Sequence, residues 1–489
     1  MKTIFNEKKY IQLQAESILK RVEMFGEKLY LEVGGKLFDD YHASRVMPGF
    51  SPDAKIKMLS TLKDKIEYIV VASANDIEQN KIRADLNISY ETEVVRLTQK
   101  FKEVGIENGS IVINQYNKQP NADRFIRKLK NAGVKVFKHY NIAGYPFNID
   151  LILSKDGFGK NDLIPTEKPI VLVTAPGPGS GKLSTCLSQI YNETQNGIKS
   201  GYAKYETFPI WNLPLHHPLN LAYEAATCDL NDVDMIDQYH LEKYGVLSVN
   251  YNRDIEAFPV LKKMFAQLYG ETPYYSPTDM GVNKVGFCIE DEKGCEEACK
   301  AEIVRRYYQT LVNVKLGKFQ DSALEKIISI MNELGITKEQ RLVANAALEK
   351  ANIAKVDACA MQLKDGTIIT GKLSKLMCAT SACTINALKY LAHIDDKIMV
   401  MSPTILDPII ELKVQKLGQN NPRLHTDEVL TILAVSSSVN PLCQLLIDKL
   451  GELKGCEFHA SYIVSDRDEK TLKKLGLNVT CESCNSVKK

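Results

Sequence analysis

The sequence lacks the features that mark several classes of protein. Its 62 Lys and Arg nearly balance 60 Asp and Glu, so the net charge is only +2 and no overall field draws it to nucleic acid or anionic lipid. No apolar run approaches the roughly 18 residues of a membrane span. The charged N-terminal segment lacks the apolar core of a secretory signal. We therefore expect a cytoplasmic protein that binds neither nucleic acid nor membrane.

Closely spaced metal ligands are also missing. Cys295 and Cys299 are four residues apart, and Cys481 and Cys484 form a CxxC, but neither pair has a second Cys or His pair nearby. A zinc site needs about four ligands, so we expect no zinc. Most of the other cysteines, Cys378 among them, lie in apolar or helical stretches and are predicted to pack as small hydrophobic side chains.

What remains is the composition of a globular protein. Hydrophobic residues make up 44% and charged residues 25% of 489 residues, which favours two to four domains. Six short apolar runs in the first third predict buried strands, with helices between several of them. They are 29–33, 68–72, 110–114, 134–137, 149–153 and 169–174. This alternation predicts an α/β fold with a doubly wound, mostly parallel sheet, whose ligands bind beyond the carboxyl ends of the strands.

The rest of the chain divides in two. From about Leu219 the spacing of apolar residues is helical, including a long amphipathic helix over 254–269. The last third is mixed, with a predicted hairpin around Asp365-Gly366, a strand over 397–401 and closing strands near 457–464 and 477–480. We predict a Rossmann-like, P-loop-like domain over 1–218, a mostly helical segment over 219–352 and a smaller α/β subdomain over 353–489.

The clearest chemical signal is a glycine-rich loop between the predicted strand 169–174 and a helix that ends near Gly197. Its residues are Gly177, Gly179, Ser180, Gly181 and Lys182. Glycines allow backbone N–H groups to converge on an anion, and the helix N-terminus adds further N–H groups. The pattern departs from a Walker A motif, with Pro176 at the first position and Leu183 after the lysine. Ser184 and Thr185 come one and two residues late, and a one-residue shift turns a helical side chain by about 100°.

Other polar residues support this loop, although each has a structural explanation. A Gly34-Gly35-Lys36 turn with Arg45 would suit an anionic group, or is a tight turn with surface charges. A proline-rich segment near residue 210 carries Glu206 and His217, which could act as acid or base, or could only stiffen a connection. Asp229 and the aspartates after it suit magnesium or cap helices.

Several long phrases together resemble a known family. They are KLYLEVGGKLFDDYHASRVMPGF, NQYN, TAPGPGSGKLSTCLSQIYN, YAKYETFPIWNLPLHHPLNLAYEAAT and CEFHASYIVSDRDEKTLKKLGLNVT. They are similar, over essentially the whole chain, to an uncharacterised bacterial family, the domain of unknown function 1846. The resemblance implies a nucleotide-binding-like N-terminal half, a helical insert and a C-terminal subdomain similar in topology to the cytidine deaminase architecture. It implies no activity, and the deaminase zinc pattern is absent, because Glu457-Phe458-His459 has the reverse order and no proline precedes Cys481.

Two functions follow as hypotheses. In the first, an ATP-dependent enzyme with Mg²⁺ acts on a small polar substrate, with Lys182, His217 and Glu206 as catalytic residues and Asp229 on the metal. In the second, a sensor binds a phosphorylated metabolite without turning it over. The predicted ligand-binding residues are Gly177, Gly179, Ser180, Gly181, Lys182, Ser184, Thr185, Lys36 and Arg45. Whether the chain forms a homo-oligomer stays open.

Overall fold

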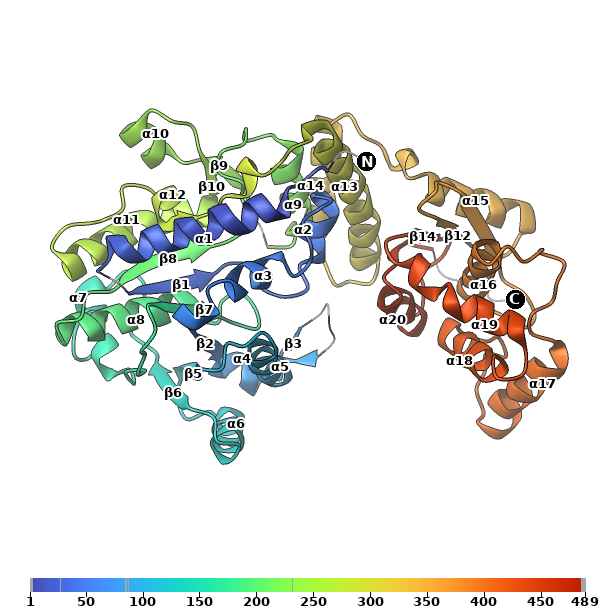
Figure 1. The fold of residues 1–489 in the computed structure, drawn as a ribbon, viewed down its shortest axis with the longest axis horizontal. Coiled ribbons are helices and arrows are strands. Elements are labelled where there is room, and N and C mark those ends of the chain that lie inside the picture. The colour runs from blue at the N-terminus through green and yellow to red at the C-terminus, as the bar shows by residue number, and fades with distance from the viewer. Residues whose placement is uncertain (1–2, 27, 84–85, 87, 231, 485–489) are drawn as a thin grey trace. The chain divides into compact units, whose positions relative to one another are not determined.

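The computed structural model describes residues 3–26, 28–83, 86, 88–230 and 232–484. The chain divides into two compact units, Met1–Cys299 and Lys300–Lys489, which run from blue to yellow and from yellow to red in Figure 1. The middle segment that we predicted over 219–352 is shared between them. Among the described residues, no helix combines the length and apolar character that crossing a bilayer requires.

The N-terminal unit contains a seven-stranded sheet in which all neighbouring strands are parallel. Its order is β11-β8-β1-β7-β2-β5-β6, and the strands from β8 to β6 follow one another down Figure 1. The bounds are β1 Leu29–Val33, β2 Ile66–Ser73, β5 Gly109–Tyr116, β6 Val136–Tyr140, β7 Ile170–Thr174, β8 Gly201–Tyr205 and β11 Gly281–Val282. Every residue of β1, β2 and β7 is buried, as expected of parallel strands covered on both faces.

The path of the chain changes direction at the centre of this sheet. After β1 it adds β2, β5 and β6 toward one edge, returns to β7 between β1 and β2, and then continues to β8 and β11 at the other edge. In open parallel sheets, ligands bind beyond the carboxyl ends of the strands where the order reverses. The loop after β7 therefore occupies the favoured position for a ligand.

Helices and two small strand pairs complete the N-terminal unit. The helices are α1 Glu7–Met24, α2 Tyr41–Val46, α3 Ala54–Ser60, α4 Ala74–Glu78, α5 Tyr90–Glu103, α6 Pro120–Asn131, α7 Ile149–Ile152, α8 Lys182–Gln195, α9 Pro218–Ala226, α10 Gln238–Tyr244, α11 Asn252–Tyr269 and α12 Pro277–Met280, with α13 Glu292–Lys315 crossing into the second unit. The pairs are β3 Ile82–Arg83 with β4 Ile88–Ser89, and β9 Asp234–Ile236 with β10 Val249–Tyr251. The predicted helix over 254–269 is confirmed as α11, and α6 is one of the helices predicted between the strands.

Three predictions of secondary structure were wrong. The apolar run 149–153 is the single-turn helix α7, because the Asn148 side chain accepts a hydrogen bond from the Leu151 N–H and starts a helical turn. The helical pattern predicted from about Leu219 is interrupted by strand β9, and the chain becomes helical again only after Asp237, which caps α10. Residues 397–401 form no strand, although Val400 and Met401 are buried. Short apolar runs show that a segment is buried and leave its backbone conformation undecided.

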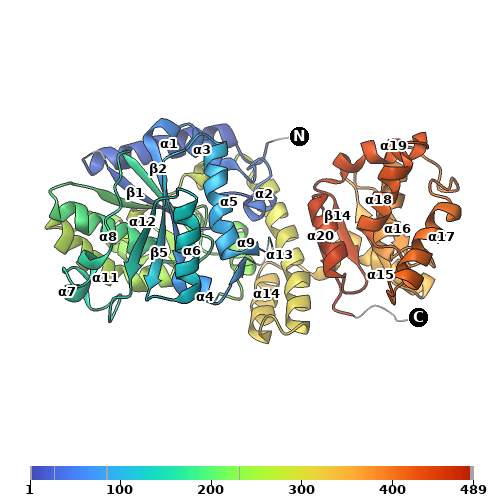
Figure 2. The ribbon, with the colours of Figure 1, turned by 90° about the horizontal axis from the view of Figure 1, so that it is seen from below.

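The C-terminal unit is built around a mixed four-stranded sheet of order β13-β12-β14-β15. Its strands are β12 Ala358–Gln362, β13 Ile368–Lys372, β14 Glu457–Ala460 and β15 Asn478–Cys481, with β12 and β13 as the predicted hairpin and β14 parallel to β15. The helices are α14 Asp321–Glu333, α15 Leu342–Ala354, α16 Ala379–Leu391, α17 Pro403–Glu411, α18 Thr426–Ser436, α19 Pro441–Asp448 and α20 Asp466–Lys474. Helices α16, α18 and α19 lie together in both views (Figures 1 and 2).

Candidate functional site

The glycine loop, residues 175–181, joins β7 to α8 at the position where the strand order reverses. Gly181 is the residue before the helix and has φ +94°, and a Cβ there would overlap the Asn114 side-chain amide. A Cβ at Gly177 would overlap the Tyr90 hydroxyl. At Gly181 both the positive φ and the nearby Asn114 amide favour glycine, whereas at Gly177 the favouring factor is the close approach of the Tyr90 hydroxyl.

Two hydrogen bonds hold the glycine loop closed. The Asn114 Nδ2, at the end of β5, donates to the carbonyl oxygen of Ser180 at 3.3 Å. The Ser180 hydroxyl donates to the carbonyl oxygen of Gly177 at 3.0 Å. Ser180 is fully buried, so its side chain stabilises the loop and does not face solvent. The first residues of α8 line a cavity.

This cavity has a volume of about 450 Å³, within the range of small-molecule sites. Its wall comes from the ends of β1, β5 and β6 and from the start of α8. The lining residues are Glu32, Asn114, Gln115, Tyr140, Asn141, Ile142, Tyr145, Gly179, Gly181, Lys182, Leu183 and Ser184. The predicted residues Gly179, Gly181, Lys182 and Ser184 thus share one cavity, and the remaining predicted residues lie outside its lining.

Lys182 faces a carboxylate in this cavity, that of Glu32, which was not among the predicted site residues. Its Nζ lies 3.9 Å from Oε1 of Glu32, and the two side chains are 16% and 11% exposed. The other Glu32 oxygen accepts a hydrogen bond from the Tyr202 hydroxyl at 2.8 Å. The signal for Glu32 was a single charged residue inside an otherwise apolar strand, Leu-Tyr-Leu-Glu-Val.

The two hydroxyl residues after Leu183 differ in what they contact. The Thr185 hydroxyl donates to the carbonyl oxygen of Gly181 at 2.9 Å, inside the first turn of α8. Ser184 lines the cavity beside Tyr145. Tyr145 is 38% exposed, and its side chain is hydrogen-bonded to that of Ser184. Of the two, only Ser184 has its side chain at the cavity.

Glu206, at the end of β8, belongs to a second charged group. Its Oε2 lies 3.1 Å from Nζ of Lys204, which also pairs with Asp254 of α11. Burial raises the pKa of Glu206, Lys204 opposes that rise and Asp254 adds to it. A carboxyl group with a raised pKa is better suited to proton transfer at neutral pH than an ordinary glutamate. A Cβ at Gly34 would touch the Glu206 side chain, so this group packs directly on the Gly34-Gly35-Lys36 turn.

A buried lysine, Lys55, stabilises the Gly34-Gly35-Lys36 turn. Lys55 of α3 is 1% exposed, and its Nζ donates to the carbonyl oxygen of Lys36 at 2.8 Å and lies 3.3 Å from Oδ2 of Asp40. The Lys36 side chain is exposed, whereas Arg45 in α2 is half-buried. Lys55 had no distinguishing sequence signal, since it lies in an ordinary amphipathic stretch.

The two remaining predicted residues have other surroundings. His217 caps α9, because its Nδ1 accepts a hydrogen bond from the Leu219 N–H at 3.1 Å, and its Nε2 lies 3.0 Å from Oε1 of Glu292. Asp229 lies in an exposed turn after α9. The capping explanation is confirmed for Asp237, which accepts a hydrogen bond from the His240 N–H at 3.1 Å.

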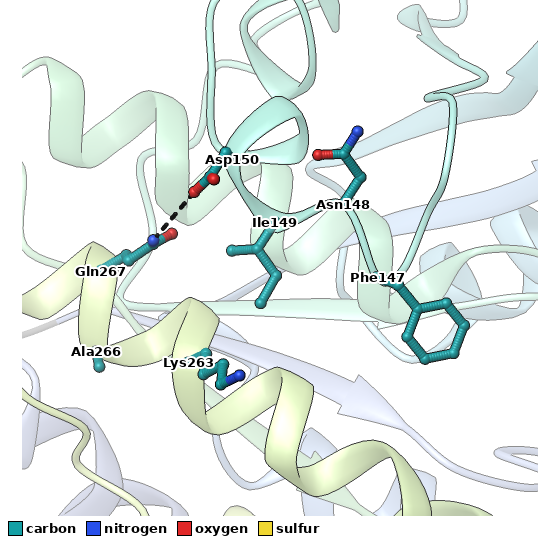
Figure 3. Close-up of a pocket in the computed structure, with 7 residues that line it drawn as sticks. All are labelled: Phe147, Asn148, Ile149, Asp150, Lys263, Ala266 and Gln267. Carbon is teal, nitrogen blue, oxygen red and sulfur yellow. Dashed lines mark hydrogen bonds between the residues drawn. The ribbon is translucent and has the colours of Figure 1, made fainter.

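A second hollow of about 470 Å³ lies between α7 and α11 (Figure 3). Gln267 of α11 contacts Asp150 of α7 across it, with 3.5 Å between Nε2 and Oδ1. Lys263 is the cation in its lining. Its lining shares no residue with that of the cavity beside the glycine loop and includes no strand end.

Comparison with known proteins covers the whole chain. The family model described as domain of unknown function DUF1846, N-terminal, matches residues 3–335, and the corresponding C-terminal model matches residues 339–489. A UPF0371 protein of Streptococcus pyogenes serotype M5 is 52% identical over 481 residues, which are 98% of this chain and 97% of the relative. A UPF0371 protein of Streptococcus pneumoniae strain CGSP14 is 52% identical over 479 residues, with the same coverage. The chain therefore belongs to the DUF1846 family, as the resemblance in its sequence implied.

Proposed function

We propose that the N-terminal unit binds a phosphorylated small molecule, with ATP as the first candidate, at the cavity beside the glycine loop. The single observation that supports this most strongly is the combination of Gly181 in its left-handed conformation, the first turn of α8 and Lys182 at one cavity. Backbone N–H groups at a helix N-terminus and a lysine are the groups that bind phosphate in P-loop proteins. The loop is P-loop-like in this sense.

In the enzymatic form of this proposal, Lys182 stabilises charge on the transferred phosphoryl group. Glu32 lies within 4 Å of Lys182 and is a better candidate for a magnesium ligand than Asp229, because Asp229 is outside the cavity. Glu206 lies outside the cavity lining, against the Gly34-Gly35-Lys36 turn, and is the candidate base for a substrate bound at that turn. The small polar substrate would then contact Lys36 or Arg45.

The alternative is a sensor that binds without turnover. Two observations favour it: Leu183 stands where a Walker A motif has the magnesium-binding hydroxyl, and the Thr185 hydroxyl is already hydrogen-bonded to the Gly181 carbonyl oxygen. A bound phosphate without a fixed metal ion would not be activated for transfer.

Two further proposals concern the whole protein. A cytoplasmic location is supported by twelve cysteines without a disulfide, as is usual in reducing compartments. Similarity of the C-terminal unit to the cytidine deaminase architecture is supported by the strand order β13-β12-β14-β15 with a hairpin at one edge. Neither proposal assigns a reaction.

The test is titration of ATP, ADP and inorganic phosphate into the full chain, with and without Mg²⁺. Replacing Lys182 with alanine removes a charged hydrogen-bond donor, so we expect the Kd of the bound ligand to rise roughly 10- to 100-fold. Lys118→Ala, which removes an exposed lysine at the same edge of the sheet, should leave the Kd unchanged. Equal effects of the two variants, or no binding by the wild type, would contradict the proposal. Phosphate release by the wild type distinguishes the enzyme from the sensor.

A further inference from the structure

Three residues that are far apart in the sequence meet in the C-terminal unit. Cys378 precedes α16, His425 precedes α18 and Asp468 lies in the first turn of α20. The Cys378 Sγ lies 3.9 Å from Nδ1 of His425, and that Nδ1 lies 2.7 Å from Oδ2 of Asp468. One sulfur, one nitrogen and one oxygen therefore lie within 4.8 Å of one another.

The surrounding structure orients each of these groups. The Asp468 carboxylate accepts hydrogen bonds from the Thr426 N–H at 2.8 Å and from the Ser465 hydroxyl at 2.9 Å. The backbone N–H of His425 donates to Oε2 of Glu428 at 2.8 Å. Hydrogen bonds of this kind, from residues just outside a site, fix the direction of ligating side chains.

The side chains of Cys378 and Asp468 are buried, so water has little access to them. Cys378 is 7% exposed, and the Asp468 side chain is 3% exposed. The ends of α16 and α20 at the cluster are helix N-termini, which stabilise the negative charge of a thiolate or a carboxylate. Together a thiolate and a carboxylate carry the charge that a divalent cation would neutralise.

The arrangement differs from that of a Cys-His-Asp nucleophile. In a catalytic triad the imidazole contacts the nucleophile through one ring nitrogen and the carboxylate through the other. Here the same nitrogen, Nδ1 of His425, faces both Cys378 and Asp468, while Nε2 lies 3.4 Å from Nδ2 of Asn421. A proton cannot pass through His425 from the sulfur to the carboxylate in this geometry. A cation in place of the Nδ1 proton would contact all three groups at once.

We propose that Cys378, His425 and Asp468 form a binding site for a divalent transition metal of the zinc type. A thiolate and an imidazole select zinc and similar ions over calcium and magnesium, which prefer oxygen ligands. Three protein ligands leave a fourth position for water or an external ligand, as in catalytic zinc sites. The absence of closely spaced ligands in the sequence predicted no zinc, whereas these three ligands are distributed over residues 378–468.

The test uses Co²⁺ as a spectroscopic substitute for zinc in the full-length protein after removal of metal by a chelator. We expect one Co²⁺ per chain, with an absorption band from thiolate-to-cobalt charge transfer. In Cys378→Ser this band should disappear. Loss of a residue that only supports a metal ligand lowers metal affinity by about 10-fold or more, so loss of a ligand itself should lower the affinity by more than about 10-fold. Asp468→Asn should weaken binding while the sulfur band remains.

Matched controls separate this site from other cysteines. Cys383→Ser changes a buried cysteine in the same helix, whose Sγ contacts the carbonyl oxygen of Ile369 at 3.6 Å, and it should keep the band. Cys484→Ser removes one residue of the terminal CxxC and should also keep it. Zinc should raise the Tm of the wild type and of both controls but not of Cys378→Ser. Absence of a band in the wild type, its survival in Cys378→Ser or its loss only in Cys484→Ser would overturn the proposal.

Discussion

At the scale of single residues, His139 near the end of β6 is the clearest pH-sensitive group. Its side chain is fully buried, and its Nε2 lies 3.2 Å from the carbonyl oxygen of Asp162. Burial lowers the pKa of His139 to about 4, against about 6.5 in an exposed histidine. The native state therefore keeps a neutral imidazole at a pH where the unfolded chain binds a proton.

The sign of the resulting pH dependence follows from that difference. The contribution of His139 to stability is fully present above pH 6.5 and is lost as the pH falls toward 4. Between pH 7 and pH 5 the free energy of unfolding should fall by about 2 kcal/mol because of this residue. In His139→Gln the free energy of unfolding should fall by about 2 kcal/mol less between these two pH values than it does in the wild type. Urea unfolding at pH 7 and pH 5 measures it. His216→Gln, which changes an exposed histidine, is the control, and an unchanged pH dependence in His139→Gln would refute the prediction.

At the scale of elements, Arg341 joins two strands to the start of α15. It precedes that helix and is 7% exposed. Its guanidinium donates to Glu457 Oε2 at 2.6 Å, to the Thr480 hydroxyl at 2.9 Å, and to the carbonyl oxygens of Phe458 at 3.1 Å and Asn478 at 3.2 Å. The helix is thereby fixed to both β14 and β15.

Removing this arginine should weaken the C-terminal unit strongly. In Arg341→Met the Glu457 carboxylate loses one of its two arginine partners and keeps Arg305 and the Asn478 side-chain amide, and breaking a buried ion pair typically costs about 3–5 kcal/mol. Arg467→Met, which breaks an exposed pair with Asp427, should cost less than about 1 kcal/mol. The measurement is denaturant unfolding of both variants, and similar losses of stability would show that Arg341 does not have the role we assign.

At the scale of the whole molecule, two compact units with separate cores should unfold in two steps. Calorimetry of the full chain should resolve two transitions, and Arg341→Met should lower the Tm of only one of them. A phosphorylated ligand should raise the Tm of the N-terminal unit. Zinc should raise the Tm of the C-terminal unit, which is the one that Arg341→Met lowers. A single transition that shifts as a whole with every ligand would contradict this assignment.

The order of helices and strands was largely predictable, because burial imposes a pattern on the residues of each element. Strands β1, β2, β5 and β7 each contain the run of mostly apolar residues that predicted them, and helix α6 buries Phe125, Ile126 and Leu129 as its spacing predicts. Prediction was wrong where a single local hydrogen bond decided the backbone, as at α7, and where a buried run belonged to no regular element, as at 397–401.

For the candidate site, the chain itself marks the glycine loop, since loop glycines, Lys182 and α8 are consecutive residues. Tertiary structure alone decides which groups face them. Glu32 lies near Lys182 because β1 pairs with β7, and Cys378, His425 and Asp468 meet because three helices begin at the same place. Local sequence determines the conformation of a segment and the chemistry that it carries, whereas contacts between distant segments depend on how the whole chain packs its core.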